Sequence, residues 1–383
     1  MKILPRVLLW FCLSLLLFAC SDKKKSETSN SIKKYGVLVK DTLNFDSIAS
    51  KIPNLLKKYD VPAVSVAVIQ EGKVVWSFVH GMQSADKIAD EQTLFLTASI
   101  AKPLTAEVFL RLVSHGKVSL DEPMYKYWLD PDIADDPRAK LLTPRHVLTH
   151  QTGFKNWRYL TDDKLRFERS PGMEMGYSGE GLQYLVLFVE HKLGRDFNDI
   201  AKEVLFIPEG MKNTAMKQQD WYEGRVAAPK FPDGTWREPV IRAEEIGAGG
   251  VHTTASDYAK FVASIMVKEA IPKKLRHEQY KVSLNQNDKC PEFTDKPGVC
   301  PDVLGFGLGW YIYEYADDWV VGHTGANNGE RTLAVFSPDK KSGLVVMTNG
   351  ANGNYVIYDI ARWAGIPQKF IELEGPKKPF SKD

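Results

Sequence analysis

The chain has 383 residues, of which 44% are hydrophobic and 26% charged, and its formal net charge is +2. This length and balance are those of an ordinary globular protein that can bury a large core. The nearly neutral charge leaves no electrostatic footprint for nucleic acid, which excludes a role that depends on binding DNA or RNA.

The first twenty residues are typical of a secretory signal. Lys2 and Arg6 precede an apolar stretch, residues 7–19, that is too short to span a bilayer comfortably. Cys20 directly follows the small residue Ala19. This arrangement resembles the bacterial lipobox, in which the cysteine is acylated and becomes the mature N-terminus.

We therefore expect a signal peptide over residues 1–19, a lipidated Cys20 and a flexible polar tether over residues 20–45. The acyl chains would hold the protein on a membrane of the bacterial cell envelope, facing the periplasm or the cell exterior. A plain signal peptide or an uncleaved anchor is the alternative. We expect a monomer.

The folded part should begin near Asp46 with a helix, because its apolar residues recur along one helical stripe. Two β-branched runs follow and are joined by Glu71 and Gly72, which predicts a hairpin. A buried helix from about Ser99 to Ser114 comes next.

Strand signals fade over residues 121–245, where helical segments alternate with loops rich in proline and glycine. Three further strand candidates and a closing helix follow. We predict an α+β fold with a central antiparallel sheet of about five strands flanked by helices. Its two sequence parts are residues 46–120 and 246–365, with a mainly helical insert between them and a C-terminal tail over residues 366–383.

Two cysteines, Cys290 and Cys300, lie in a turn-rich segment near the end of the chain. Outside the cytoplasm they could close a small disulfide loop, and two free thiols are equally compatible with the sequence. Neither cysteine has the neighbours that a metal site requires, so we expect no metal and no other cofactor.

Ser99 and Lys102 lie three residues apart at the head of the buried helix. One helical turn places both side chains on the same face. An apolar wall disfavours the charged form of a lysine, which lowers its pKa towards the range of a useful base for a serine nucleophile. The alternative is a helix-capping serine followed by a surface lysine.

Two further stretches favour the nucleophile–base pair over the capping serine. Tyr177 lies in a turn flanked by glycine, immediately before an apolar helix, and His323, Thr324 and Gly325 end a predicted strand. The order Ser99-Ile100-Ala101-Lys102, Tyr177-Ser178-Gly179, His323-Thr324-Gly325 resembles the three motifs of the serine β-lactamase and penicillin-binding-protein superfamily. The similarity is greatest to its class C-related branch and runs from about residue 46 to residue 365.

The resemblance implies a role for each matching residue. Ser99 would attack a carbonyl carbon, and Lys102 and Tyr177 would carry the proton. The backbone N–H groups of Ser99 and Ala326 would form the oxyanion hole. The remaining motif residues would contact substrate: His323, Thr324, Gly325 and Gly179. His150, in "LTHQTG", is expected to be structural.

The sequence departs from the family pattern at two of these positions. Members that act on penicillins or D-Ala-D-Ala peptides usually have asparagine where this chain has Gly179, and lysine where it has His323. Loss of the asparagine amide removes a contact to the amide on the acyl side of the substrate. A neutral histidine would hold a substrate carboxylate less firmly than a lysine.

The sequence therefore predicts a serine hydrolase that cleaves a small ester or amide, including those of short peptides. A D,D-carboxypeptidase or β-lactamase within the same family is the first alternative. A non-catalytic binding protein on the hydrolase scaffold is the second, and the glycine at residue 179 is its only support in the sequence.

Overall fold

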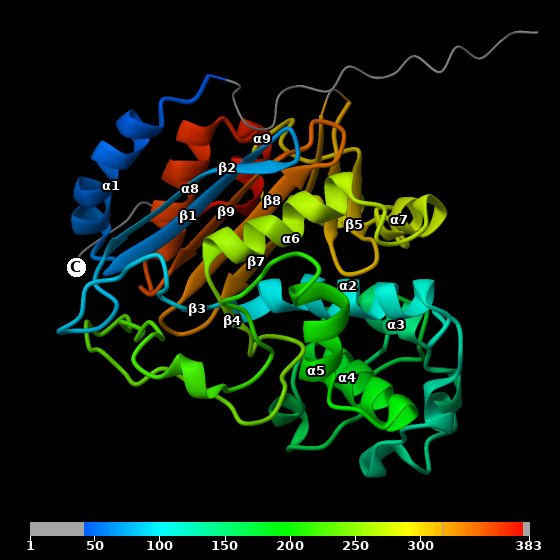
Figure 1. Ribbon diagram of the computed structural model, residues 1–383. Helices are drawn as coiled ribbons and strands as arrows, with labels where there is room; N and C mark the ends of the chain where they lie inside the picture. Colours follow the sequence, from blue (N-terminus) through cyan, green and yellow to red (C-terminus); the bar gives the residue numbers. More distant parts are fainter. Residues whose placement is uncertain (1–41, 317, 378–383) are drawn as a thin grey trace, which may run out of the picture. The chain divides into compact units, whose positions relative to one another are not determined.

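The computed structural model describes residues 42–316 and 318–377 (Figure 1). The predicted signal peptide, Cys20 and most of the tether lie outside the described residues. A single large antiparallel sheet forms the centre of the described part, with the order β2-β1-β9-β8-β7-β6-β5. Its strands are β1 (Ala63–Gln70), β2 (Lys73–Gly81), β5 (Val303–Phe306), β6 (Tyr311–Glu314), β7 (Trp319–Ala326), β8 (Arg331–Ser337) and β9 (Ser342–Thr348).

Both ends of the described chain contribute to this sheet, because β1 pairs with β2 on one side and with β9 on the other. The sheet is antiparallel throughout, as the sequence predicts. A second, two-stranded sheet joins β3 (Phe95–Leu96) to β4 (His252–Thr253). This small sheet lies directly before the turn that carries Ser99, and so ties that turn to the far end of the helical insert.

Helices cover both faces of the large sheet. Figure 1 shows α6 crossing one face, while α1 and α8 lie on the other. Helices α3, α4 and α5 lie within the insert, while α2 and α7 lie before and after it in the sequence. The α-helices are α1 (Phe45–Tyr59), α2 (Ala101–Ser114), α3 (Pro144–Leu148), α4 (Gly179–Leu193), α5 (Phe197–Ala201), α6 (Ala255–Val267), α7 (Lys273–Gln279), α8 (Gly353–Ala364) and α9 (Gln368–Glu374).

Local sequence chemistry explains several of these boundaries. Glu71 and Gly72 both have positive φ, at 50° and 70°, which is the backbone of the tight hairpin turn between β1 and β2. Thr143 caps α3, with Pro144 as the first helical residue. Thr254 caps α6 by accepting a hydrogen bond from the backbone N–H of Asp257 at 3.1 Å.

The structure corrects the predicted number of strands from about five to seven. The first predicted strand of the C-terminal part folds back on itself as the hairpin β6–β7. The additional strand β5 was missed because it is only four residues long and contains Gly305. Residues 366–383 were predicted to be a tail, yet α9 lies within this range and buries Phe370 and Ile371 against the core.

Cys290 and Cys300 are joined by a disulfide, with their Cα atoms 5.8 Å apart. Of the two outcomes that the sequence left open, the structure has the bonded pair. Among the helices of residues 42–316 and 318–377, none is long and apolar enough to cross a membrane.

A buried network of charges holds α2 against its neighbours. Glu107 is fully buried on α2, and its carboxylate lies 3.1 Å from Arg111 Nε and 2.7 Å from Arg276 Nη1. Arg111 also pairs with Glu209 at 2.8 Å. Burial alone would raise the pKa of Glu107, but the charges and hydrogen bonds of Arg276 and Arg111 lower it overall. The helix that begins beside Ser99 is therefore anchored by paired charges as well as by apolar packing.

The network predicts a large loss of stability when its central carboxylate is removed. Glu107→Gln leaves two buried guanidinium groups short of one negative charge, which should lower the free energy of unfolding by about 3–5 kcal/mol in urea titrations at pH 7. Because its folded-state pKa is lowered, the contribution of Glu107 is fully present above the unfolded value of about 4.3 and is lost as the pH falls through the folded-state pKa.

Lys268→Gln is the matched control for this experiment. Lys268 pairs with Glu209 at 2.6 Å, but its side chain is 54% exposed. Its removal should therefore cost less than about 1 kcal/mol. Equal losses for the two variants would contradict a structural role for the buried network.

Candidate active site

Ser99 lies in a short 3₁₀ turn, Ala98–Ile100, between β3 and α2. The residue before it, Ala98, has φ of +46°, a left-handed conformation that is costly for a residue other than glycine. Thr97 fixes the entry to this turn, since its backbone N–H donates to Val251 O at 2.9 Å and its carbonyl accepts from Thr332 Oγ1 at 2.8 Å. The Ser99 side chain is thus presented at a strained and tightly held turn, and it remains partly exposed.

Lys102 lies one turn further on and is almost completely buried, with 1% of its surface exposed. Its Nζ donates to Ser99 Oγ at 3.1 Å and to the backbone carbonyl of Ala248 at 2.8 Å. Within residues 42–316 and 318–377, no carboxylate lies within ion-pair distance of this amine. Burial without a compensating negative charge lowers the pKa of Lys102 to about 7. Near neutral pH a substantial share of the amine is therefore uncharged and can accept a proton.

Tyr177 lies beside both Ser99 and Lys102. Its phenol hydrogen-bonds the Ser99 side chain, and Lys102 Nζ lies 4.7 Å from the centre of its ring. Burial raises the pKa of Tyr177 above its usual value, more than the hydrogen bond to Ser99 lowers it. The phenol is therefore protonated at neutral pH, which suits a group that passes a proton on and does not suit a permanent base.

His150 packs against the ring of Tyr177. The two rings stack with centroids 4.4 Å apart, and His150 Nδ1 accepts a hydrogen bond from the backbone N–H of Ser178 at 3.1 Å. Burial lowers the pKa of His150 well below its usual value, so the ring is neutral. His150 is thus a neutral ring packed against Tyr177, and its structural role stays a prediction.

Strand β7 brings the third motif against the Ser99 turn. Strand β6 pairs with β7 only as far as Gly322, so the edge of β7 beyond this point faces the turn and not a neighbouring strand. A Cβ atom on Gly325 would lie 2.6 Å from Thr97 O and 3.0 Å from Ser99 N. Only glycine lets the two segments approach this closely. Thr324 is partly exposed beside them, and Ala326 is exposed at the end of the strand.

His323 lies below the surface of the site, because only 3% of the residue is exposed. Its Nδ1 lies 2.7 Å from its neighbour's carbonyl oxygen, Thr324 O, and its ring packs among Tyr177, Phe306 and Tyr311. Burial, together with the nearby charge of Lys102, lowers the pKa of His323 to about 3. The ring is therefore neutral and covered, whereas the sequence suggested a side chain in direct contact with substrate.

Gly179 is also covered. It is the first residue of α4, and the indole of Trp157 lies over its Cα atom in the direction that a side chain would take. The structure thus brings Ser99, Lys102, Tyr177 and the end of β7 together, and it places Gly179 behind a tryptophan that the sequence analysis did not single out.

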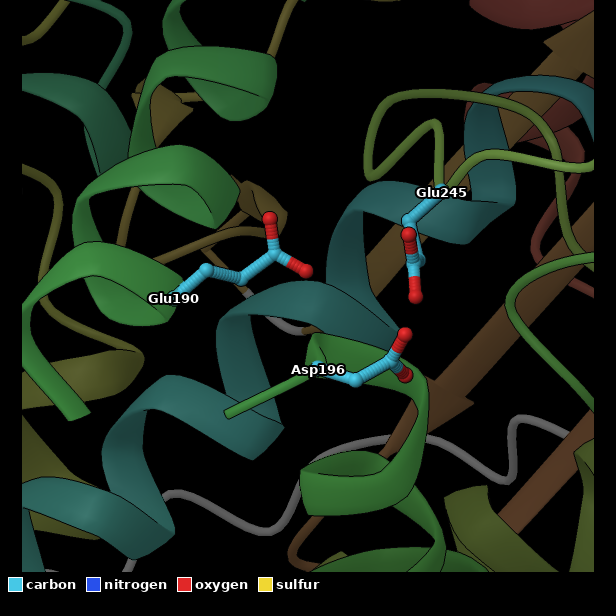
Figure 2. Close-up of side chains that lie close together, drawn as sticks. All are labelled: Glu190, Asp196 and Glu245. Atoms are coloured by element: carbon cyan, nitrogen blue, oxygen red, sulfur yellow. The ribbon is translucent and has the colours of Figure 1, made fainter. Parts of the chain in front are cut away.

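A group of three carboxylates lies near the loop that provides the Ala248 carbonyl. Figure 2 shows Glu190, Asp196 and Glu245 converging, and one oxygen from each lies within 4.8 Å of the others. Lys217 pairs with Asp196 and lies 2.9 Å from Glu245 Oε1. Glu190 Oε1 accepts from the backbone N–H of Phe197 at 2.9 Å. A lysine already supplies the positive charge here, so we read this group as an anchor for the 245–248 loop and not as a metal site.

Two groups described above are absent from the residues that the sequence predicted for the site. Trp157 gives no recognisable signal, because its role depends on a tertiary contact. The Ala248 carbonyl belongs to the segment "GAGG", residues 247–250, whose glycines could have pointed to a close approach of the backbone. A Cβ on Gly247 would lie 2.6 Å from Val186 Cγ2, which explains the glycine before Ala248.

Several known proteins are similar to this chain. It is 25% identical over 342 residues to the unguisins hydrolase ungD' of Aspergillus campestris, a match that covers 81% of this chain and 62% of the relative. It is 21% identical over 272 residues to the D-alanyl-D-alanine-carboxypeptidase/endopeptidase AmpH of Escherichia coli K12, covering 65% of this chain and 69% of the relative. The chain thus spans less than two thirds of the fungal relative's length.

Solved structures with the same fold include the octameric penicillin-binding protein homologue from Pyrococcus abyssi, with a TM-score of 0.71, 21% identity, and coverage of 86% of this chain and 79% of that one. The D-alanine carboxypeptidase AmpC from Burkholderia cenocepacia aligns with a TM-score of 0.67 and 22% identity, over 84% of this chain and 97% of that one. At these identities the likeness shows the fold.

The family model described as Beta-lactamase matches residues 48–365, which is most of the chain and includes every residue of the site described above. With the fold, the curated relatives and this match in agreement, the chain belongs to the beta-lactamase family.

Proposed function

We propose that the protein cleaves a small ester or amide through an acyl-Ser99 intermediate, with Lys102 as the base and Tyr177 as the proton carrier. One observation supports this proposal above the others. The Lys102 amine lies 3.1 Å from Ser99 Oγ, with its pKa near 7 and with no carboxylate among the described residues to hold its proton. A hydroxyl beside such an amine is an activated nucleophile.

The steps follow from the positions of these groups. Ser99 Oγ bonds to the substrate carbonyl carbon while its proton passes to Lys102 Nζ. The backbone N–H groups of Ser99 and Ala326 stabilise the oxyanion of the tetrahedral intermediate. As the bond to the leaving group breaks, the proton moves through the Tyr177 hydroxyl to the leaving oxygen or nitrogen. Water then attacks the acyl-enzyme, and the same groups act in reverse to release the acid.

A D,D-carboxypeptidase activity is the second candidate. It is favoured by the names of two relatives, AmpH and the Burkholderia cenocepacia AmpC. The neutral, covered ring of His323 and the covered Gly179 argue against it, because neither offers the charge or the amide that such substrates would use. We therefore favour an ester or amide with another acyl group.

We also propose that the enzyme is anchored in the bacterial cell envelope by lipid on Cys20. The support is the basic, apolar and small-residue pattern of the first twenty residues, with a polar stretch between Cys20 and α1. An enzyme held in this way would act on substrates outside the cytoplasm.

Covalent labelling tests the nucleophile. Treatment with a fluorophosphonate, followed by mass spectrometry of the peptides, should place a single adduct on Ser99. Ser99→Ala should lose both the label and ester turnover. An unlabelled wild type, under conditions that label a known family member, would remove the proposed mechanism.

A substrate panel separates the two candidates and the binding-protein alternative. We expect turnover of p-nitrophenyl esters and little or none of nitrocefin or of D-Ala-D-Ala peptides. Efficient release of D-alanine would favour the carboxypeptidase. Turnover that disappears in Ser99→Ala would exclude a purely binding function.

The pH dependence of acylation tests the base. Since only the neutral amine accepts a proton, the rate of Ser99 labelling should rise with pH, reach half its maximum near pH 7 and level off above about pH 8. Tyr177→Phe, which cannot pass a proton to the leaving group, should lower the rate of amide hydrolysis by about 10²–10⁴-fold while keeping this midpoint for labelling. A midpoint near the ordinary lysine value of about 10.4 would show that Lys102 is not the base.

Lipid attachment is tested by expressing the full chain in a bacterium with radiolabelled palmitate. The wild type should incorporate label and partition into detergent. Cys20→Ser should do neither, while a Cys12→Ser control should behave as the wild type. Equal labelling of the wild type and Cys20→Ser would contradict the proposed anchor.

A further inference from the structure

The indole of Trp157 occupies the space that a side chain at residue 179 would need. A Cβ atom built on Gly179 would lie 2.6, 2.7 and 2.8 Å from Cη2, Cζ2 and Cζ3 of that ring. All three distances are shorter than any normal contact between carbon atoms. Glycine at residue 179 and tryptophan at residue 157 therefore form a matched pair, since the ring can take this position only where the helix begins without a side chain.

The neighbours of Trp157 in the chain hold it against the start of α4. The backbone carbonyl of Asn156 accepts hydrogen bonds from the N–H groups of Gly179 and Glu180, both at 3.0 Å, and Asn156 Oδ1 accepts from Gly179 N at 2.8 Å. On the other side, the N–H of Arg158 donates to Glu180 Oε1 at 2.9 Å. The segment is bonded on both sides of the tryptophan, so the position of the ring is fixed by the fold.

This ring lies next to the segment that carries Tyr177. Gly179 follows Tyr177 by two residues, and the Tyr177 phenol contacts Ser99. Trp157 packs on the main core and stays partly exposed over the start of α4. Where an asparagine at residue 179 would offer an amide to the substrate, this chain offers aromatic carbon.

We propose that Trp157 is the specificity-determining residue of the site, and that it selects esters and amides with an apolar acyl chain over those that carry an amide in the acyl chain. An amide buried against the indole would lose its hydrogen bonds to water without gaining new ones, whereas an alkyl or aryl chain would gain contact area. This inference rests on the proposed acyl-Ser99 mechanism and names the substrate class for the same site.

A pair of esters with the same leaving group and the same acyl length measures the preference. The p-nitrophenyl ester of pentanoic acid has an alkyl chain, and that of N-acetylglycine has an amide in the same place. The quantity compared is the ratio of kcat/KM for the two esters, after subtraction of the uncatalysed rates. The wild type should prefer the pentanoate.

Two double variants form the matched pair of proteins. Trp157→Ala/Gly179→Asn removes the ring and supplies an amide, while Trp157→Ala/Gly179→Ala removes the ring and supplies only a methyl group. The asparagine variant should favour the N-acetylglycinate by about tenfold relative to the alanine variant, since one hydrogen bond to a buried amide is worth about that factor. Trp157→Phe, which keeps an aromatic surface, should retain the wild-type preference.

The result that overturns the inference is a ratio that is equal in the wild type and both double variants while all three hydrolyse the pentanoate. If the wild type hydrolyses neither ester and Ser99 takes no fluorophosphonate label, the proposed function itself fails, which is a different result. If the double variants do not fold, Trp157→Gln compared with Trp157→Phe decides the question. The glutamine variant must then gain on the N-acetylglycinate, and equal ratios would overturn the inference.

Discussion

The burial of the Lys102 amine without a neighbouring carboxylate is the constraint on which the rest of the site depends. A carboxylate at ion-pair distance would stabilise the ammonium and keep its pKa high. Here the Lys102 amine donates hydrogen bonds to a backbone carbonyl and to the Ser99 hydroxyl, and both of these partners are uncharged. The amine is therefore held in place and is still able to lose its proton near neutral pH.

Holding an uncharged amine by neutral partners demands precise placement of segments that are far apart in the sequence. The Ala248 carbonyl belongs to a loop that is fixed at its start by the pair of Glu245 and Lys217, and next to Ala248 by the hydrogen bond from Thr105 Oγ1 to Gly247 O at 2.7 Å. The three carboxylates shown in Figure 2 contribute to this placement. They anchor the loop that positions the acceptor for Lys102, and the buried charges around Glu107 anchor the helix that carries the donor.

The sequence predicted those features that depend on neighbouring residues. The Ser99–Lys102 spacing, the Glu71–Gly72 turn and the Thr143 cap are each decided within a few positions of the chain. The features that it missed depend on tertiary contacts. Residues 366–383 have the composition of a polar tail, and only the structure shows that α9 packs its apolar residues on the core. The alternation of apolar and polar residues over 311–326 does not indicate where the chain turns between β6 and β7. The covered ring of His323 and the indole over Gly179 likewise follow from what packs against them.

The two tasks of the site are carried by different kinds of atoms. In the proposed mechanism, proton transfer depends on Lys102, Tyr177 and backbone groups whose positions are set by hydrogen bonding and by glycines at close approaches. We expect these groups to stay in place when a side chain that only lines the site is substituted. Contact with the acyl group depends instead on the Trp157 side chain and on the space left by Gly179. Because the two sets consist of different residues, we expect the acyl preference to change by substitution at these two positions while the chemistry at Ser99 stays the same. The separation is a physical reason why one scaffold can serve hydrolases with different substrates.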